Sequence, residues 1–169
     1  NIGLGDSAGT AITSGSENTV VGYQAGDALT TASANVALGT YALSSDTLGG
    51  SSVAIGRAAL ANQNFTSATD AYNTAVGTRA GVEVTTGVQN TFIGGQSGDA
   101  NTTASYNTAV GYSALSANTT GVQNVGVGRN TLYTNTTGDY NTALGNSALY
   151  ANTTGSQNTA LGFEAASSN

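Results

Sequence analysis

The sequence contains no cysteine, histidine, lysine, proline, methionine or tryptophan. Without cysteine it has no disulfides and no thiolate metal sites. Without histidine, cysteine or lysine it lacks the side chains that most often act as catalytic bases and nucleophiles. Its nine acidic residues are scattered over different positions and form no calcium-binding pattern. We therefore predict that the chain is not an enzyme and that it holds no cofactor or metal.

Charge is also scarce, and positive charge most of all. Only 7% of the 169 residues are charged, against about 25% in an ordinary domain, and nine acids face three arginines for a net charge of −6. Such a chain cannot neutralise a run of phosphates, which excludes nucleic acid as a partner. No apolar run approaches the roughly 20 residues of a spanning helix, so we predict no membrane insertion.

What the sequence does contain is one short pattern, repeated. Asparagine, a β-branched residue, a small residue, an aliphatic residue and glycine recur every 17 residues. The fourth unit, 52–72, is four residues longer, and the tenth ends at Asn169. We interpret residues 1–169 as one repeat array and, because the chain begins inside a repeat without a methionine, as a segment of a longer fibre. The units begin at residues 1, 18, 35, 52, 73, 90, 107, 124, 141 and 158.

The pattern within a unit predicts strands and not helices. Positions 2 to 4 alternate as a short strand does, and positions 13 to 15, often Thr-Thr-Gly, predict a second strand and turn. Glycine at position 5 should end the first strand with a positive φ or a close backbone approach. It occupies that position in all ten units, as Gly5, Gly22, Gly39, Gly56, Gly77, Gly94, Gly111, Gly128, Gly145 and Gly162.

A 17-residue unit cannot bury a core alone, so we expect the units to stack as the coils of a parallel β-solenoid. Asparagine at position 1 should form a ladder of stacked amides. Leucine at position 9 accompanies a polar position 12, whereas glycine at position 9 accompanies an aliphatic one, which indicates one interior site filled from either side. Unit six, with Gly98 and Asn101, breaks this rule.

The small residues at position 3 point away from positions 2 and 4. We expect them to form a flat, narrow apolar stripe down the outside of the coil, suited to close contact with another chain. We therefore expect a homo-oligomer, and a homotrimer in preference to a dimer because three coils can close around an axis.

Unit four begins SVAIGRAA, and the other units are variants of it, such as NTAVGYSA at Asn107 and NVALGTYA at Asn35. These resemble the head repeats of YadA-like trimeric autotransporter adhesins, which also occur in bacteriophage tail fibres. The resemblance covers the whole chain. It implies a left-handed β-roll, an obligate homotrimer, an extracellular place on a cell surface or virion tail fibre, and attachment to a glycan or protein receptor. The 17-residue period is longer than that family's usual unit.

An alternative function rests on position 13, which is threonine from Thr13 to Thr153 in every regular full unit. A regular threonine ladder on a solenoid is a surface that can bind ice. The competing explanation is that threonine favours strands and can hydrogen-bond along a stack.

Recognition is expected where the units differ. Position 6 varies most and is predicted to be exposed, while two tyrosines at position 10 should stack one coil apart. The segment 61–72 (ANQNFTSATDAY) should bulge from the rod, with its phenylalanine either tucked beneath the loop or displayed. The candidate recognition residues are Tyr23, Arg57, Phe65, Tyr112, Arg129, Tyr133, Tyr150 and Phe163.

Overall fold

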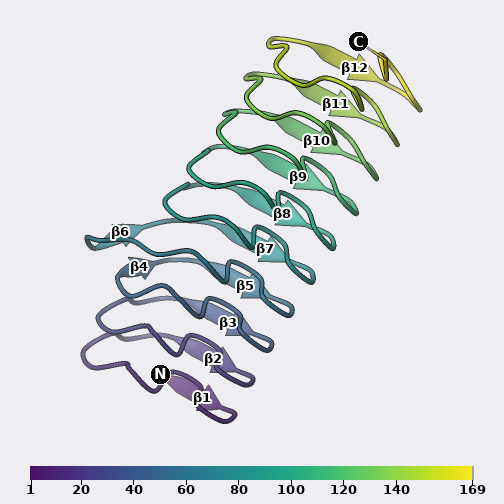
Figure 1. Ribbon diagram of the computed structural model, residues 1–169. Helices are drawn as coiled ribbons and strands as arrows, with labels where there is room; N and C mark the ends of the chain where they lie inside the picture. The colour runs from purple at the N-terminus through teal and green to yellow at the C-terminus, as the bar shows by residue number, and fades with distance from the viewer. Residues whose placement is uncertain (169) are drawn as a thin grey trace.

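Each repeat contributes one three-residue strand at positions 2 to 4, and the ten strands stack into one parallel sheet (Figure 1). The computed structural model describes residues 1–168. The strands are β1 (Ile2–Leu4), β2 (Thr19–Val21), β3 (Val36–Leu38), β5 (Val53–Ile55), β7 (Thr74–Val76), β8 (Thr91–Ile93), β9 (Thr108–Val110), β10 (Val125–Val127), β11 (Thr142–Leu144) and β12 (Thr159–Leu161).

The register confirms the predicted parallel β-solenoid. Within residues 1–168, each strand pairs with the strand 17 residues later, as Val125 does with Thr142, except that β5 pairs with β7 21 residues ahead, Val53 with Thr74. The chain thus makes about nine turns of a rod with its termini at opposite ends (Figure 1). Nine steps of about 4.8 Å give the sheet a length of about 43 Å. Residues 1–168 form no helix, and therefore none that could cross a membrane.

The predicted second strand in every coil is wrong. Within residues 1–168 the only such pair is β4 (Gly49–Gly50) of the third coil with β6 (Thr69–Asp70) of the longer fourth coil. In the regular coils positions 13 and 14 form bends, and in the first coil, for example, the amides of both Thr13 and Gly15 donate to the single carbonyl of Thr30. Two donors on one acceptor break the alternation that a regular ladder needs.

Glycine at position 5 serves both of the purposes predicted for it. Its φ lies between 123° and 141° in all ten coils, a region that residues with a Cβ rarely adopt. At Gly56, an added Cβ would also lie 2.6 Å from the carbonyl carbon and oxygen of Gly77 in the next coil. Every coil therefore turns over its neighbour with backbone against backbone.

The strand faces are opposite to those expected. Position 3 points inward and is buried from Val20 to Ala160, whereas positions 2 and 4 point outward. The expected outer stripe of small residues is thus an inner one. The reason is the narrow interior, which side chains from the opposite wall already fill. At Gly126, even an added methyl group would lie 2.6 Å from Cδ1 of Leu115.

The exchange between positions 9 and 12 fills this interior, and the exception in unit six has a physical explanation. The leucines at position 9, such as Leu43, are buried, and so are the position-12 residues Leu29 and Val84, while Ile12 in the first coil is partly buried. Phe92, a large residue at position 3, is also fully buried and lies where a side chain on Gly81 or Gly98 would have to go. The ring of Phe92 thus fills the volume that a leucine at position 9 of coil six would occupy.

The predicted asparagine ladder at position 1 lies inside the rod and holds adjacent coils together. The side chain of Asn124 donates to the Gly138 carbonyl at 2.8 Å and accepts the amide of Asn141 at 2.9 Å. In coils six to nine, a second buried amide ladder runs at position 12, where Asn135 bonds both Asn118 and the same Gly138 carbonyl. These side chains satisfy backbone groups that no strand partner reaches.

Candidate functional site

The outer side of the ten-stranded sheet is a uniform surface that runs through all ten coils. This sheet face consists of the residues at positions 2 and 4 of the ten coils. No coil carries a charged residue at positions 2 to 4, and position 4 is leucine, isoleucine or valine throughout. Leu38 and Ile93, far from the ends of the rod, keep 44% and 40% of their surface exposed. The solenoid therefore displays a long apolar face that no residue of the described chain covers.

The threonines at position 13 are engaged in holding the coils together. The hydroxyl of Thr102 donates to the carbonyl of Thr119 at 3.1 Å, and Thr119 donates to Thr136 at the same distance. The same bond recurs from Thr13, Thr30, Thr85 and Thr136. These hydroxyls bond the neighbouring coil, so this column acts as a structural ladder. The threonines at position 2 differ, because within residues 1–168 their hydroxyls make no hydrogen bond to protein.

The fourth coil departs from the pattern because its insertion displaces the backbone that an asparagine at position 1 would bond. Ser52 occupies that position, and Gln63 completes the amide ladder. The side chain of Gln63 donates to Ser52 Oγ at 3.0 Å and accepts from Asn73 at 2.8 Å. It also donates to the buried carboxylate of Asp46 at 2.6 Å. The insertion is thus built into the core network.

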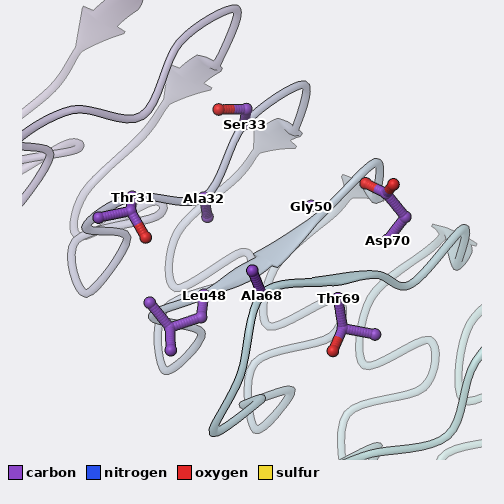
Figure 2. Close-up of a pocket in the computed structure, with 8 residues that line it drawn as sticks. All are labelled: Thr31, Ala32, Ser33, Leu48, Gly50, Ala68, Thr69 and Asp70. Atoms are coloured by element: carbon purple, nitrogen blue, oxygen red, sulfur yellow. The ribbon is translucent and has the colours of Figure 1, made fainter.

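Beside this insertion lies a recess of roughly 240 Å³ between the second coil and β6 (Figure 2). The carboxylate of Asp70 stands at one end of it and accepts a hydrogen bond from Ser51 Oγ at 3.0 Å. Phe65 is tucked beneath the loop with 5% of its surface exposed, so the loop does not display it. The residues that line the recess are Thr31, Ala32, Ser33, Leu48, Gly50, Ala68, Thr69 and Asp70.

The remaining candidate recognition residues lie at the surface in two groups. At position 6, Tyr23, Arg57, Tyr112, Arg129 and Phe163 are exposed. At position 10, Tyr133 and Tyr150 stack with ring centroids 5.1 Å apart and planes 8° from parallel, as predicted.

A second aromatic pair lies near the N-terminal end of the rod. Tyr23 meets Tyr41 edge to face at 5.5 Å, and this neighbour raises the pKa of Tyr23. The two aromatic pairs lie in different coils and at different positions of the repeat. They therefore do not combine into one site.

The two aspartates at position 10 are partly buried and incompletely hydrogen-bonded. One carboxylate oxygen of Asp27 and one of Asp99 are buried without a hydrogen-bond partner. Burial raises the pKa of Asp99, and the nearby Ser116 and Arg79 oppose that rise. Across the part of the chain that the structure describes, no three acidic side chains lie close enough together to hold a metal ion.

A column at position 17 is a feature that sequence reasoning missed. From the fourth coil to the ninth, this position alternates between tyrosine and glutamine. The main-chain amides of Gln89 and Tyr106 donate to the main-chain carbonyls of Ala71 and Val88 in the preceding coil. The signal was the alternation of two residue types at one position of successive units. We call this set the Tyr/Gln column; it consists of Tyr72, Gln89, Tyr106, Gln123, Tyr140 and Gln157.

No family model matches the chain, and comparisons with curated proteins and with solved structures give no significant match.

Proposed function

We propose that this chain is a structural and adhesive segment of an extracellular fibre, in which three copies associate side by side through the sheet face. The observation that carries the proposal is that this face is uncharged and presents an outward-pointing aliphatic residue at position 4 of every coil. Soluble monomers rarely leave so continuous an apolar surface uncovered. The resemblance to trimeric adhesin and tail-fibre repeats supports the choice of three copies and of attachment as the role.

The size and charge of the sheet face suit a second copy of the same chain. A stable interface engages about 20 to 30 residues from each partner. The sheet face offers twenty, two from each of ten strands. Although each chain carries a net charge of −6, none of that charge lies on this face, so copies can approach there without direct repulsion.

Association would also explain how such a thin coil forms a strong fibre. Three parallel rods would cover their apolar faces and multiply any weak contact with a host surface. The stacked backbone hydrogen bonds and amide ladders would resist unfolding along each rod. The segment would then act as a spacer and as a multivalent attachment surface.

The test is the mass of the protein in solution, measured by sedimentation equilibrium. We expect three copies for the parent chain and one for the double variant Ile93→Glu, Val127→Glu, which places two charges on the sheet face. The control Thr78→Glu adds charge at exposed position 6 and should remain trimeric. Circular dichroism would verify that all three proteins keep the fold. A well-folded parent monomer, or a parent dimer, would rule the trimer out.

Ice binding stays as a second candidate, and the free hydroxyls at position 2 favour it there over position 13. Six of the ten residues at position 2 are threonines, set beside the aliphatic residues of position 4 at the regular spacing of the coils. Thermal hysteresis of the parent at micromolar concentration, abolished by Thr108→Lys, would establish this function. Its absence would remove it.

A further inference from the structure

The Tyr/Gln column presents three aromatic rings in a line along the rod. Tyr72, Tyr106 and Tyr140 keep 57%, 52% and 53% of their surface exposed. Within residues 1–168, none of their hydroxyls and none of the intervening glutamine amides makes a hydrogen bond to protein. An exposed tyrosine offers an apolar face and a polar tip, and three in a row gain nothing for the core. The column therefore needs a role outside the fold.

The backbone gives these side chains one common orientation. All six residues of the Tyr/Gln column have a left-handed conformation, with φ between 50° and 64°. Because the same conformation recurs in every coil, the Cα–Cβ bonds of the column are parallel, and the rings project from equivalent points. The platform is thus set by the solenoid and does not depend on a flexible loop.

The spacing of the rings selects the shape of the ligand. Consecutive coils are about 4.8 Å apart, so tyrosines in alternate coils are about 9.6 Å apart. That is close to the length of two sugar units in an extended β-1,4-linked glycan, in which every second ring presents the same face. The tyrosines would then stack under every second sugar of the chain. The glutamines would lie beside the intervening sugars and bond their hydroxyls.

The charge of the column selects the chemistry. None of its six residues is charged, and the acids nearest to it along the chain are Asp70, two residues before Tyr72, and Asp139, directly before Tyr140. With no cationic side chain in the column, an anionic polysaccharide would find no counter-charge there. We propose that the Tyr/Gln column binds a neutral, linear β-1,4-linked polysaccharide, of the cellulose or chitin type, laid parallel to the axis of the rod.

This proposal deepens the attachment role proposed above, because it names the class of surface that the fibre would hold. A polymer that contacts all three tyrosines of a Tyr/Gln column would bind by avidity, because each contact is weak by itself. The proposal rests on that role, but it concerns binding and not assembly. The two can therefore fail separately.

The experiment uses soluble cellohexaose and N-acetylchitohexaose in titration calorimetry, together with retention on insoluble cellulose and chitin. The parent chain should bind at least one of the two β-linked chemistries and should not bind α-linked maltohexaose. Replacing Tyr72, Tyr106 and Tyr140 together by glutamine should abolish detectable binding. Each single replacement should weaken it roughly tenfold. Glutamine is the chosen substitute because the column already accepts it with the same backbone conformation.

Two matched variants separate spacing from aromatic content. The double variant Tyr106→Gln, Gln123→Tyr keeps three tyrosines but changes their intervals to three coils and one, and it should weaken binding as much as Tyr106→Gln alone. The variant Tyr41→Ala removes an exposed tyrosine outside the column and should bind as the parent does.

Four results would overturn the proposal. They are a parent that binds neither β-linked chemistry, undiminished binding by the triple variant, undiminished binding by the shifted variant, and a change in oligomeric mass on triple substitution. The last would show that a second copy of the chain covers the column. A monomeric parent that still binds glycan would reject the trimer alone, whereas an assembled parent that binds none would reject the glycan site alone.

Discussion

Coils seven to nine and coils four to six build the same interior in different ways. In residues 107–157 three coils repeat one solution, with leucine at position 9 and asparagine at positions 1 and 12. In residues 52–106, positions 1, 9 and 12 each carry a different residue in at least one coil. Yet each change lies beside another that offsets it, as Gln63 lies beside Ser52 and as two glycines lie beside Phe92.

The comparison teaches that stacking preserves interior volume and hydrogen bonding more strictly than residue identity. A coil packs only against its two neighbours, so a departure must be offset within one coil of itself. The regular coils carry no such substitutes. A single change there should therefore cost more than the same difference costs in coils four to six, where it already has a partner.

The largest effect is expected when one of two residues that compensate for each other is replaced without the other. Phe92→Ala should cost about 4 kcal/mol, because it empties the volume that Gly81 and Gly98 leave open. Gly98→Leu alone should also be strongly destabilising, since the leucine would overlap the ring. Combined, they recreate the filling of coils seven to nine, where Leu115 has almost the same φ, and the cost should fall to about 1 kcal/mol.

Urea unfolding followed by circular dichroism measures this double-mutant cycle. The matched control is Leu115→Ala in coil seven, where no neighbour is enlarged to fill the space. If the double variant of Phe92 and Gly98 showed the sum of the two single costs, the idea of one shared interior volume would be wrong.

The next effect concerns the amide ladder of the regular coils. Asn124→Ser installs the residue that the fourth coil tolerates, but coil eight has no glutamine to complete the ladder. The amide of Asn141 would lose its acceptor and the Gly138 carbonyl one of its donors, at a cost of about 3 kcal/mol. Hydrogen exchange should show faster opening at the amide of Asn141, whereas unchanged protection there would contradict the role given to the ladder.

A smaller effect on stability is expected at Ser52, where a substitution toward the repeat consensus should destabilise the protein. Ser52→Asn makes the fourth unit match the other nine, a kind of change that often stabilises repeat proteins. Here it should destabilise by about 2 kcal/mol, because Gln63 already lies 3.0 Å from the fully buried Ser52 side chain. Thermal unfolding would decide, and a higher melting temperature for Ser52→Asn would contradict this account of the insertion.

The sequence predicted the period, the solenoid, the turn at position 5 and the asparagine ladder, because each depends on a residue repeated at fixed spacing. It did not predict which way the strand faces. Alternation places Ala143 opposite Thr142 and Leu144 but does not say which side is inside. That depends on the width of the coil, which is set by side chains such as Leu115 on the opposite wall. The small residues at position 3, which were expected to contact another chain, are therefore inside. The outward-facing surface carries the larger aliphatic residues of position 4.

The insertion and the surface columns show a second limit. The length of unit four was plain, but the role of Gln63 depended on where the displaced backbone came to lie. Conversely, the Tyr/Gln column was present in the letters and required only a search down position 17. The prediction of a strand at positions 13 to 15 failed because two main-chain amides of one coil donate to a single carbonyl of the next, as those of Thr85 and Gly87 do to Thr102.

The smallest effect is expected at position 10, where coil six carries Asp99 and coils seven to nine carry Ser116, Tyr133 and Tyr150. Burial raises the pKa of Asp99 above its ordinary value of 3.8, so the folded state binds its proton more tightly than the unfolded state does. The ionised form is therefore destabilising, with the full penalty above the folded pKa and none below the unfolded pKa. Asp99→Asn should raise the melting temperature slightly at neutral pH, because water still screens a half-buried carboxylate. The advantage should shrink as the pH falls through the raised pKa of Asp99 and should be gone below about 4. Melting curves of both proteins from neutral to acid pH measure it, and an advantage that grew on acidification would reverse the sign argued here.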